Sequence, residues 1–181
     1  MKLSLSWIRD YVKIPEDADL KKLAYDLTMS TVEVEDVEYL ARRFDNMVVG
    51  LIEKIEPHPN ADKLRVCQVN IGSDVKTIVC GGINLREGMR VAVSCPGAIV
   101  RWHGQGEPVE IKNSKLRGVE SYGMICASDE IGLGDLFPAS QEAEILDLSA
   151  FEVPAGTPLA TALLSWFLCV HPSRRQSRGS I

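Results

Sequence analysis

The sequence predicts an α+β protein in which a five-stranded β-barrel follows a small N-terminal α/β unit. The first observation is a change of hydrophobic period: apolar residues recur at helical spacing up to residue 27 and alternate from residue 47 onward. The second is that short strand-like runs follow one another between residues 46 and 113, with turn residues and no long helix between them. The composition, 45% hydrophobic and 25% charged over 181 residues, is that of a soluble globular protein.

The N-terminal unit is expected to begin with a strand and two helices. A short strand is predicted over residues 2–5, followed by a helix that Ser6 caps and Pro15 ends. A second helix follows, with either Asp17 or Asp19 as its N-cap. The apolar residues at helical spacing are Trp7, Ile8, Tyr11 and Val12 in the first helix and Leu20, Leu23, Ala24 and Leu27 in the second.

The unit closes, at residue 40, with an acidic run. Residues 31–40, TVEVEDVEYL, alternate valine with aspartate and glutamate, with one slip near Asp36. This alternation predicts a half-buried strand. Its outer face is too acidic to contact a nucleic acid.

Residues 41–150 are expected to form the barrel. Their strand-like runs are 47–56, 64–72, 75–82, 89–95 and 108–113. A sandwich is the alternative, but it generally needs about seven strands. Five short strands favour a Greek-key barrel of the OB type, which is a frequent scaffold for binding nucleic acids.

The sequence offers little for catalysis, metal binding or membrane insertion. Gly81 and Gly82 have no following GK[ST] and no GxGxxG pattern, so a phosphate-binding loop is not supported. The five cysteines are widely spaced, without a CxxC pair, and are interpreted as reduced and buried. No run reaches the roughly 18 apolar residues of a membrane span. Charges at Arg9 and Asp10 interrupt any signal-peptide core, so a cytoplasmic location is expected.

Charge is unevenly distributed along this acidic chain, whose net charge is −5. Residues 58–117 contain nine Lys and Arg against five Asp and Glu, whereas residues 118–160 contain eight acidic residues and no Lys or Arg. A local excess of cations can attract a polyanion to one face, although solvated strand faces explain the same counts. The cations fall in three clusters: Lys63 and Arg65; Lys112, Lys115 and Arg117; and, more weakly, Arg86 and Arg90.

These clusters favour contacts to phosphates over stacking on bases. Lys63 and Arg65 are two residues apart at a strand entry, so both side chains can lie on one side of the strand. Only Trp102 and Tyr122 are available nearby to stack on a base. Phosphate contacts by lysine and arginine release counterions and do not read sequence.

Two separated motifs resemble a known family. HPNADKLRVCQVNIG at residues 58–72 and KLRGVESYGMICASDEIGLG beginning at residue 115 resemble the tRNA-binding OB domain of the endothelial-monocyte-activating-polypeptide type. The first forty residues, which begin MKLSLSWIRDYV and end TVEVEDVEYL, resemble the start of the bacterial phenylalanyl-tRNA synthetase β-subunit family. The resemblance covers roughly residues 1–162.

The resemblance implies a non-catalytic, tRNA-binding fragment at the N-terminal end of that subunit. It places Lys63, Lys115, Arg117 and Ser121 at positions of tRNA contact. The apolar residues of the same motifs, Leu64, Leu116, Met124 and Ile125, are expected in the core. The implied partners are tRNA, specifically phenylalanine tRNA, together with the synthetase α subunit and the rest of the β subunit in a heterotetramer. ATP and Mg²⁺ belong to the parent enzyme, and no cofactor is expected in this fragment.

The resemblance also implies how the chain ends. Residues 151–163 are expected to return to the N-terminal unit, with Phe151 to Leu163 beside Trp7 and Leu23. Residues 164–181 depart from the family pattern and are expected to be disordered or non-native. Two other functions stay open: a structural module for synthetase assembly with little RNA contact, and a free-standing tRNA-binding OB protein. An enzyme acting alone is the least supported.

Overall fold

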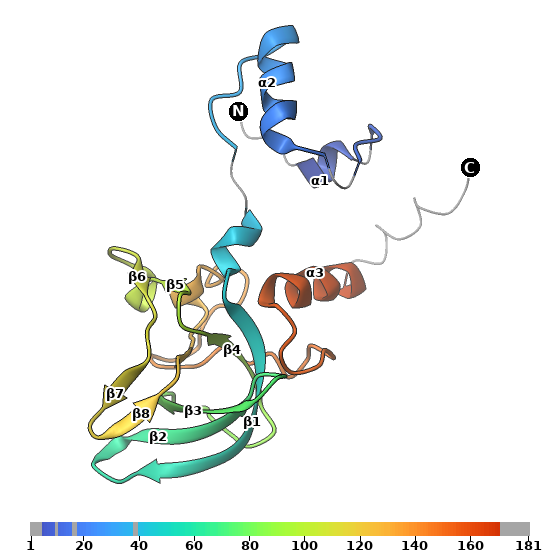
Figure 1. Cartoon of the computed structure of the whole chain (residues 1–181). Helices are drawn as coiled ribbons and strands as arrows, with labels where there is room; N and C mark the ends of the chain where they lie inside the picture. Colours follow the sequence, from blue (N-terminus) through green and yellow to red (C-terminus); the bar gives the residue numbers. More distant parts are fainter. Residues whose placement is uncertain (1–4, 10, 16–17, 38–39, 171–181) are drawn as a thin grey trace. The chain divides into compact units, whose positions relative to one another are not determined.

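The computed structural model describes residues 5–9, 11–15, 18–37 and 40–170, in two units (Figure 1). The first unit is Met1–Tyr39 and the second is Leu40–Ile181, and each is described by itself. The mixture of helices with an antiparallel sheet confirms the predicted α+β class. Among the described residues, no helix has the length and apolar composition needed to cross a membrane.

The first unit contains helices α1 (Leu5–Ile8) and α2 (Leu20–Ser30). Asp19 is the N-cap of α2, and its Oδ1 accepts hydrogen bonds from the backbone N–H groups of Lys21 (2.9 Å) and Lys22 (3.3 Å). This satisfies donors that a helix start leaves free, so Asp19 is the correct choice of the two predicted caps. The predicted strand at residues 2–5 lies outside the described residues except for Leu5, which begins α1.

The predicted strand over residues 31–40 is wrong in the part that the structure describes. Residues 31–37 have no regular secondary structure, and Leu40 begins a 3₁₀ helix, η1 (Leu40–Phe44). Local side chains take up the backbone donors: the Val34 N–H donates to Thr28 Oγ1 at 3.0 Å, and the Val37 N–H donates to Asp36 Oδ1 at 2.8 Å. Such bonds compete with a strand ladder, which the alternating valines alone did not reveal.

The second unit is built on a five-stranded antiparallel sheet with the order β3-β2-β1-β4-β9. Its strands are β1 (Met47–His58), β2 (Ala61–Asn70), β3 (Val75–Cys80), β4 (Arg90–Ser94) and β9 (Met124–Ile125). The long strand β1 pairs with β4 through its first half and with β2 through its second. Gly50 lies at this change of partner, where a Cβ atom would meet side-chain methyl groups of Val69 and Val93 at 2.6 Å. Only glycine lets the three strands approach so closely.

Four of the five predicted strands are confirmed as β1 to β4, but the fifth strand of the sheet is not the predicted one. In the predicted run 108–113, only β6 (Val109–Glu110) is a strand, and it pairs with β5 (Ile99–Val100) in a separate ribbon. The fifth place is taken by β9, whose two residues are too few to show alternation. A second ribbon joins β7 (Ser114–Leu116) to β8 (Val119–Ser121).

The end of β8 and the residue after it run along the outer edge of β3. The Tyr122 N–H donates to the Thr77 carbonyl at 2.9 Å, and the Val79 N–H donates to Ser121 Oγ at 3.0 Å. These bonds satisfy part of the edge that β3 would otherwise expose.

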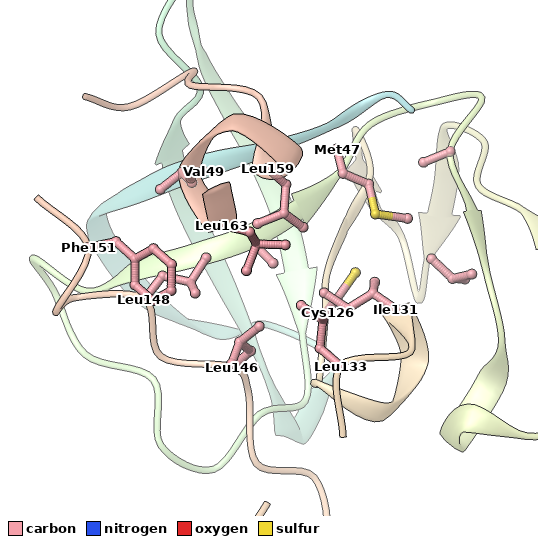
Figure 2. Close-up of a cluster of buried hydrophobic side chains, with 14 of the residues drawn as sticks. Met47, Val49, Cys126, Ile131, Leu133, Leu146, Leu148, Phe151, Leu159 and Leu163 are labelled. Atoms are coloured by element: carbon pink, nitrogen blue, oxygen red, sulfur yellow. The ribbon is translucent and has the colours of Figure 1, made fainter. Parts of the chain in front are cut away.

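The core of the second unit contains two clusters. One lies among the strands and includes Ile52, Cys67, Val69, Ile78, Val91 and Val93. In the other, Leu159 and Leu163 of α3 (Leu159–Val170) lie beside Met47 and Val49 of β1, together with Phe151 (Figure 2). Residues 151–163 are therefore part of this core. Their predicted packing against the N-terminal unit stays a prediction.

Helix α3 includes part of the segment that was expected to be disordered or non-native. It continues to Val170, so residues 164–170 are helical, and a non-native origin of these residues stays a prediction. Trp166 stacks on Phe151 with ring centroids 5.3 Å apart, which ties the helix to the core. Residues 171–181 lie outside the described residues.

Four described cysteines are free thiols, and three of them are buried. Burial raises the pKa of Cys67 and of Cys126 to about 12 and that of Cys80 to about 11. Burial also raises the pKa of Cys95, which is only half-buried. The predicted burial is confirmed for Cys67, Cys80 and Cys126. A thiol that stays protonated is a poor nucleophile and metal ligand.

Candidate nucleic-acid interface

The first predicted cationic cluster lies just after the turn of the β1–β2 hairpin. Pro59 and Asn60 form the turn, between the paired residues His58 and Ala61. Lys63 and Arg65 follow on β2, and both are exposed. Since they are two residues apart, they lie on the same side of the strand.

The second cluster lies on the β7–β8 hairpin. Lys115 is an exposed residue of β7, and Arg117 and Gly118 form the turn with φ values of 45° and 101°. Two successive positive φ values are typical of the type I′ turn, whose twist matches that of the strands it joins. Arg117 is itself exposed, so the turn carries a cation at its tip.

The structure brings the two hairpins together at their tips. His58 Nε2 lies 3.1 Å from the Leu116 carbonyl, and Asn60 Nδ2 donates to the Arg117 carbonyl at 3.0 Å. Inside the first turn, the Asn60 N–H donates to His58 Nδ1 at 3.1 Å. Cations that are about fifty residues apart in the sequence therefore belong to one pair of connected hairpins (Figure 1).

A hollow of about 710 Å³ lies between β3 and the β7–β8 hairpin. Its wall offers one cation, one carboxylate, several hydroxyl and amide groups and one aromatic ring. The lining residues are Thr77, Asn113, Ser114, Lys115, Val119, Glu120, Ser121 and Tyr122. Lys76 Nζ lies 5.1 Å from the centre of the Tyr122 ring, so a second cation borders the hollow.

Not every predicted site residue joins this surface. Lys112 is exposed, but its Nζ lies 3.6 Å from Glu110 Oε2, which partly neutralises it. Arg86 pairs with Asp147 at 2.6 Å, and Arg90 Nε donates to the Val153 carbonyl at 3.1 Å. The weaker predicted cluster thus fastens the C-terminal segment to the sheet.

Ser121 has a structural role. It is 1% exposed, its Oγ accepts the Val79 N–H at 3.0 Å, and its hydroxyl donates to the Gly123 carbonyl at 2.9 Å. Both functions of the hydroxyl are used inside the fold, in bonds that join β3 to the end of β8. The predicted contact of Ser121 with tRNA stays a prediction.

The structure also tests the predicted core positions of the two motifs. Ile125 is 2% exposed and Met124 packs against the core, as predicted. Leu116 is 40% exposed and Leu64 is half-exposed, so both predictions are wrong. Each of these leucines lies on a hairpin next to a cation, where it adds apolar area to the surface.

Ser121→Ala is expected to lower the free energy of unfolding by about 1–3 kcal/mol, because the buried Val79 N–H loses its acceptor. Binding of tRNA by the folded variant should be unchanged. Urea denaturation and a binding titration measure the two effects. Ser73→Ala, at an exposed position between β2 and β3, is the control and should leave both unchanged. Unchanged stability in Ser121→Ala would contradict the structural role.

Metal-ligating side chains do not gather beside this surface in the part of the chain that the structure describes. No group of three or more His, Cys, Asp or Glu residues is placed to hold a metal ion among the described residues. Gly82 is packed against Ile145, where a Cβ atom would meet the side chain at 2.3 Å, so this glycine serves close packing and does not cradle a phosphate.

The sequence model of a family described as "Putative tRNA binding domain" matches residues 47–158 of this chain. The match begins with β1 and includes both connected hairpins. The chain belongs to this tRNA-binding domain family. The two motifs at residues 58–72 and from residue 115 both lie inside the matched segment.

The tRNA-binding domain of this chain has curated relatives in aminoacyl-tRNA synthetases. The phenylalanine–tRNA ligase β subunit of Oceanobacillus iheyensis is 43% identical over 144 residues, which are 80% of this chain and 17% of that subunit. The corresponding subunit of Thermosynechococcus vestitus is 46% identical over 134 residues, 74% of this chain and 16% of that subunit. The predicted resemblance to this subunit is confirmed, and the chain spans only 16–17% of the length of these relatives.

Among solved structures, the tRNA-binding domain is similar to a MetRS related protein from Pyrococcus horikoshii. The sequence identity is 22% and the TM-score is 0.46, over 68% of this chain and 98% of that one.

Proposed function

We propose that this chain is a non-catalytic, tRNA-binding part of a phenylalanyl-tRNA synthetase β subunit, where it adds accessory contacts to the tRNA phosphate backbone. One observation carries the proposal. Lys63, Arg65, Lys115 and Arg117 are exposed on two hairpins whose tips are hydrogen-bonded to each other, inside the segment matched by the family. Four cations on connected hairpins can follow a polyanionic backbone, which four scattered cations cannot.

The scaffold of this function is a closed barrel of the OB type. The strand order β3-β2-β1-β4-β9 supports it, because β9 comes directly after the segment that is hydrogen-bonded to β3 through Tyr122 and Thr77. The sheet thereby returns to its first edge. In OB domains the ligand lies across the second and third strands and the loops beside them, and both cationic hairpins border that region here.

Binding is mainly electrostatic. The chain as a whole is acidic, so the cationic hairpins attract a polyanion by their local charge and not by the net charge of the molecule. Lysine and arginine side chains neutralise phosphates and release counterions. The hollow beside Lys115 and Tyr122 is large enough for a ribose or a base, and it presents hydroxyl and amide groups to such a ligand.

The parent enzyme supplies the rest of the reaction. Its partners are phenylalanine tRNA, the α subunit and the remaining β subunit of a cytoplasmic heterotetramer, and it uses ATP and Mg²⁺ to activate phenylalanine. ATP and Mg²⁺ are assigned to the rest of that enzyme, because Gly81 and Gly82 lack a phosphate-binding motif and no group of three or more metal-ligating residues occurs among the described residues. The proposed role of the chain is to bind tRNA.

The test is a titration of phenylalanine tRNA with the wild-type chain at two salt concentrations. Four phosphate contacts predict that affinity falls about a hundredfold between about 50 and 200 mM salt. A tRNA specific for another amino acid should bind with a similar affinity, because phosphate contacts do not read sequence. Undetectable binding at low salt, or binding that salt does not weaken, would contradict the proposal.

A second candidate is a module for assembly of the synthetase. The observation that favours it is the first unit, where α2 has no buried residue and the apolar side chains of Tyr25, Met29 and Val32 are 63%, 69% and 54% exposed. Such a face commonly binds another protein surface. Normal assembly of a reconstituted synthetase that lacks this chain, measured by sedimentation, would exclude the assembly role.

A further inference from the structure

We propose that His58 and Asn60 are positioning residues that hold the two cationic hairpins in a single tRNA-binding surface. The inference rests on the proposed function and goes beyond it, because neither residue contacts a phosphate by charge. His58 and Asn60 act through Lys115 and Arg117, whose hairpin they fasten. We call the three hydrogen bonds His58–Leu116, Asn60–Arg117 and Asn60–His58 the tip clasp.

The tip clasp fixes the state of the His58 ring. Its Nδ1 accepts the hydrogen bond from the Asn60 N–H, so Nδ1 carries no proton. The neutral ring therefore has its proton on Nε2, which donates to the Leu116 carbonyl at 3.1 Å. His58 is 6% exposed, so both ring nitrogens need these partners. The histidine at position 58 therefore makes hydrogen bonds within its own hairpin and to the other hairpin.

Asn60 makes the second connection. Its Nδ2 donates to the carbonyl of Arg117, the residue that forms the tip of the other hairpin. Next to it, a Cβ atom on Gly118 would lie 3.5 Å from Asn60 Nδ2, and Gly118 has a φ of 101°. The type I′ turn thus presents its backbone to Asn60 and directs the Arg117 side chain outward.

The β7–β8 hairpin needs such a connection because it is short. Each strand has three residues, and a two-stranded hairpin of this length has little stability of its own. Ser121 anchors its base to Val79 of β3, and the tip clasp anchors its opposite end to the β1–β2 turn. Without the tip clasp, Lys115 and Arg117 would become ordered only when tRNA binds. The entropy lost in ordering them would then weaken the affinity.

The test compares His58→Asn and Asn60→Ser with the wild-type chain. Asparagine at position 58 can still accept the backbone N–H of residue 60, as in an Asx turn, but is too short to reach Leu116. Asn60→Ser removes only the bond to Arg117. Asn70→Ser is the matched control, because Asn70 bonds to Gly72 and Glu53 at the opposite end of β2.

Both clasp variants are expected to bind phenylalanine tRNA roughly tenfold more weakly, with a salt dependence shallower by about one to two phosphate contacts. The control should keep the wild-type affinity and salt dependence. A double-mutant cycle adds a second readout: Lys115→Gln/Arg117→Gln should weaken binding about tenfold in the wild-type chain and only about twofold in His58→Asn, because the two changes act on one unit. A purely structural role would lower the melting temperature without this coupling.

The outcomes separate the two proposals. If the wild-type chain does not bind tRNA, the proposed function and the positioning role are both overturned. If it binds, and the clasp variants bind with the same affinity and salt dependence, only the positioning role is overturned. Nitrogen-15 NMR of the His58 ring in the wild-type chain needs no variant to fold: a proton on Nε2 supports the tip clasp, and a proton on Nδ1 overturns it.

Discussion

Replacing Lys63, Arg65, Lys115 and Arg117 by glutamate is expected to lower the affinity for tRNA by about two orders of magnitude at moderate salt, since four phosphate contacts are removed and four repulsive charges are added. All four side chains are exposed, so the change should leave the fold intact. The residual binding should depend little on salt. Circular dichroism checks the fold, and a filter-binding or anisotropy titration measures the affinity.

A control variant separates the site from the net charge of the molecule. Lys13, Lys21, Lys22 and Arg101 are exposed cations outside the two hairpins, and changing them to glutamate alters the net charge by the same amount. If tRNA binds to the connected hairpins, this control should lose only a few-fold in affinity through the weaker long-range field, which salt screens. Equal losses in the two variants would show that overall charge, and not this surface, governs binding.

The sequence identified the cationic clusters because each motif carries its own local signal, although the hairpin that holds Lys115 and Arg117 was not predicted. Lys63 and Arg65 follow a Pro-Asn turn at strand spacing, and Arg117 precedes the glycine that a type I′ turn requires. Turn chemistry and strand period are local properties, so one sequence is enough to find them. The strands β1 to β4 were predictable for the same reason.

The connection between the hairpins could not be derived in this way. His58 and Leu116 are 58 residues apart in the sequence. The bond joins the His58 side chain to a backbone carbonyl, which every residue type has, so the identity of residue 116 does not predict it. The ordered occurrence of the two motifs was the available signal, and it indicated the family without indicating the contact. Burial of Ser121 was hidden likewise, since its acceptor role depends on β3, about forty residues earlier.

The segment after residue 150 illustrates the opposite limit. The resemblance assigned residues 151–163 to the N-terminal unit, whereas Phe151, Leu159 and Leu163 also fill the core beside β1. An apolar helix has more than one face that can be buried. The spacing of its apolar residues does not show which part of the protein packs against each face. A stability measurement can test the contact that the structure describes.

Leu159→Ala is expected to destabilise the second unit by about 2–5 kcal/mol, because a fully buried leucine leaves a cavity when it is truncated. Leu159 is 0% exposed and lies in the cluster with Met47, Val49 and Phe151. Urea denaturation followed by tryptophan fluorescence measures the change, and Trp166, stacked on Phe151, reports on this cluster.

Leu164→Ala is the matched control for this loss. It removes the same side-chain atoms from the same helix, but at a position where the side chain is 64% exposed. Its effect should stay within about 0.5 kcal/mol. A large loss for Leu159 with a small one for Leu164 means that the inner face of α3 stabilises the unit that carries both cationic hairpins. The tRNA surface then depends on residues beyond 150. Equal, small losses would mean that the helix contributes little to this core and that its principal contacts lie elsewhere.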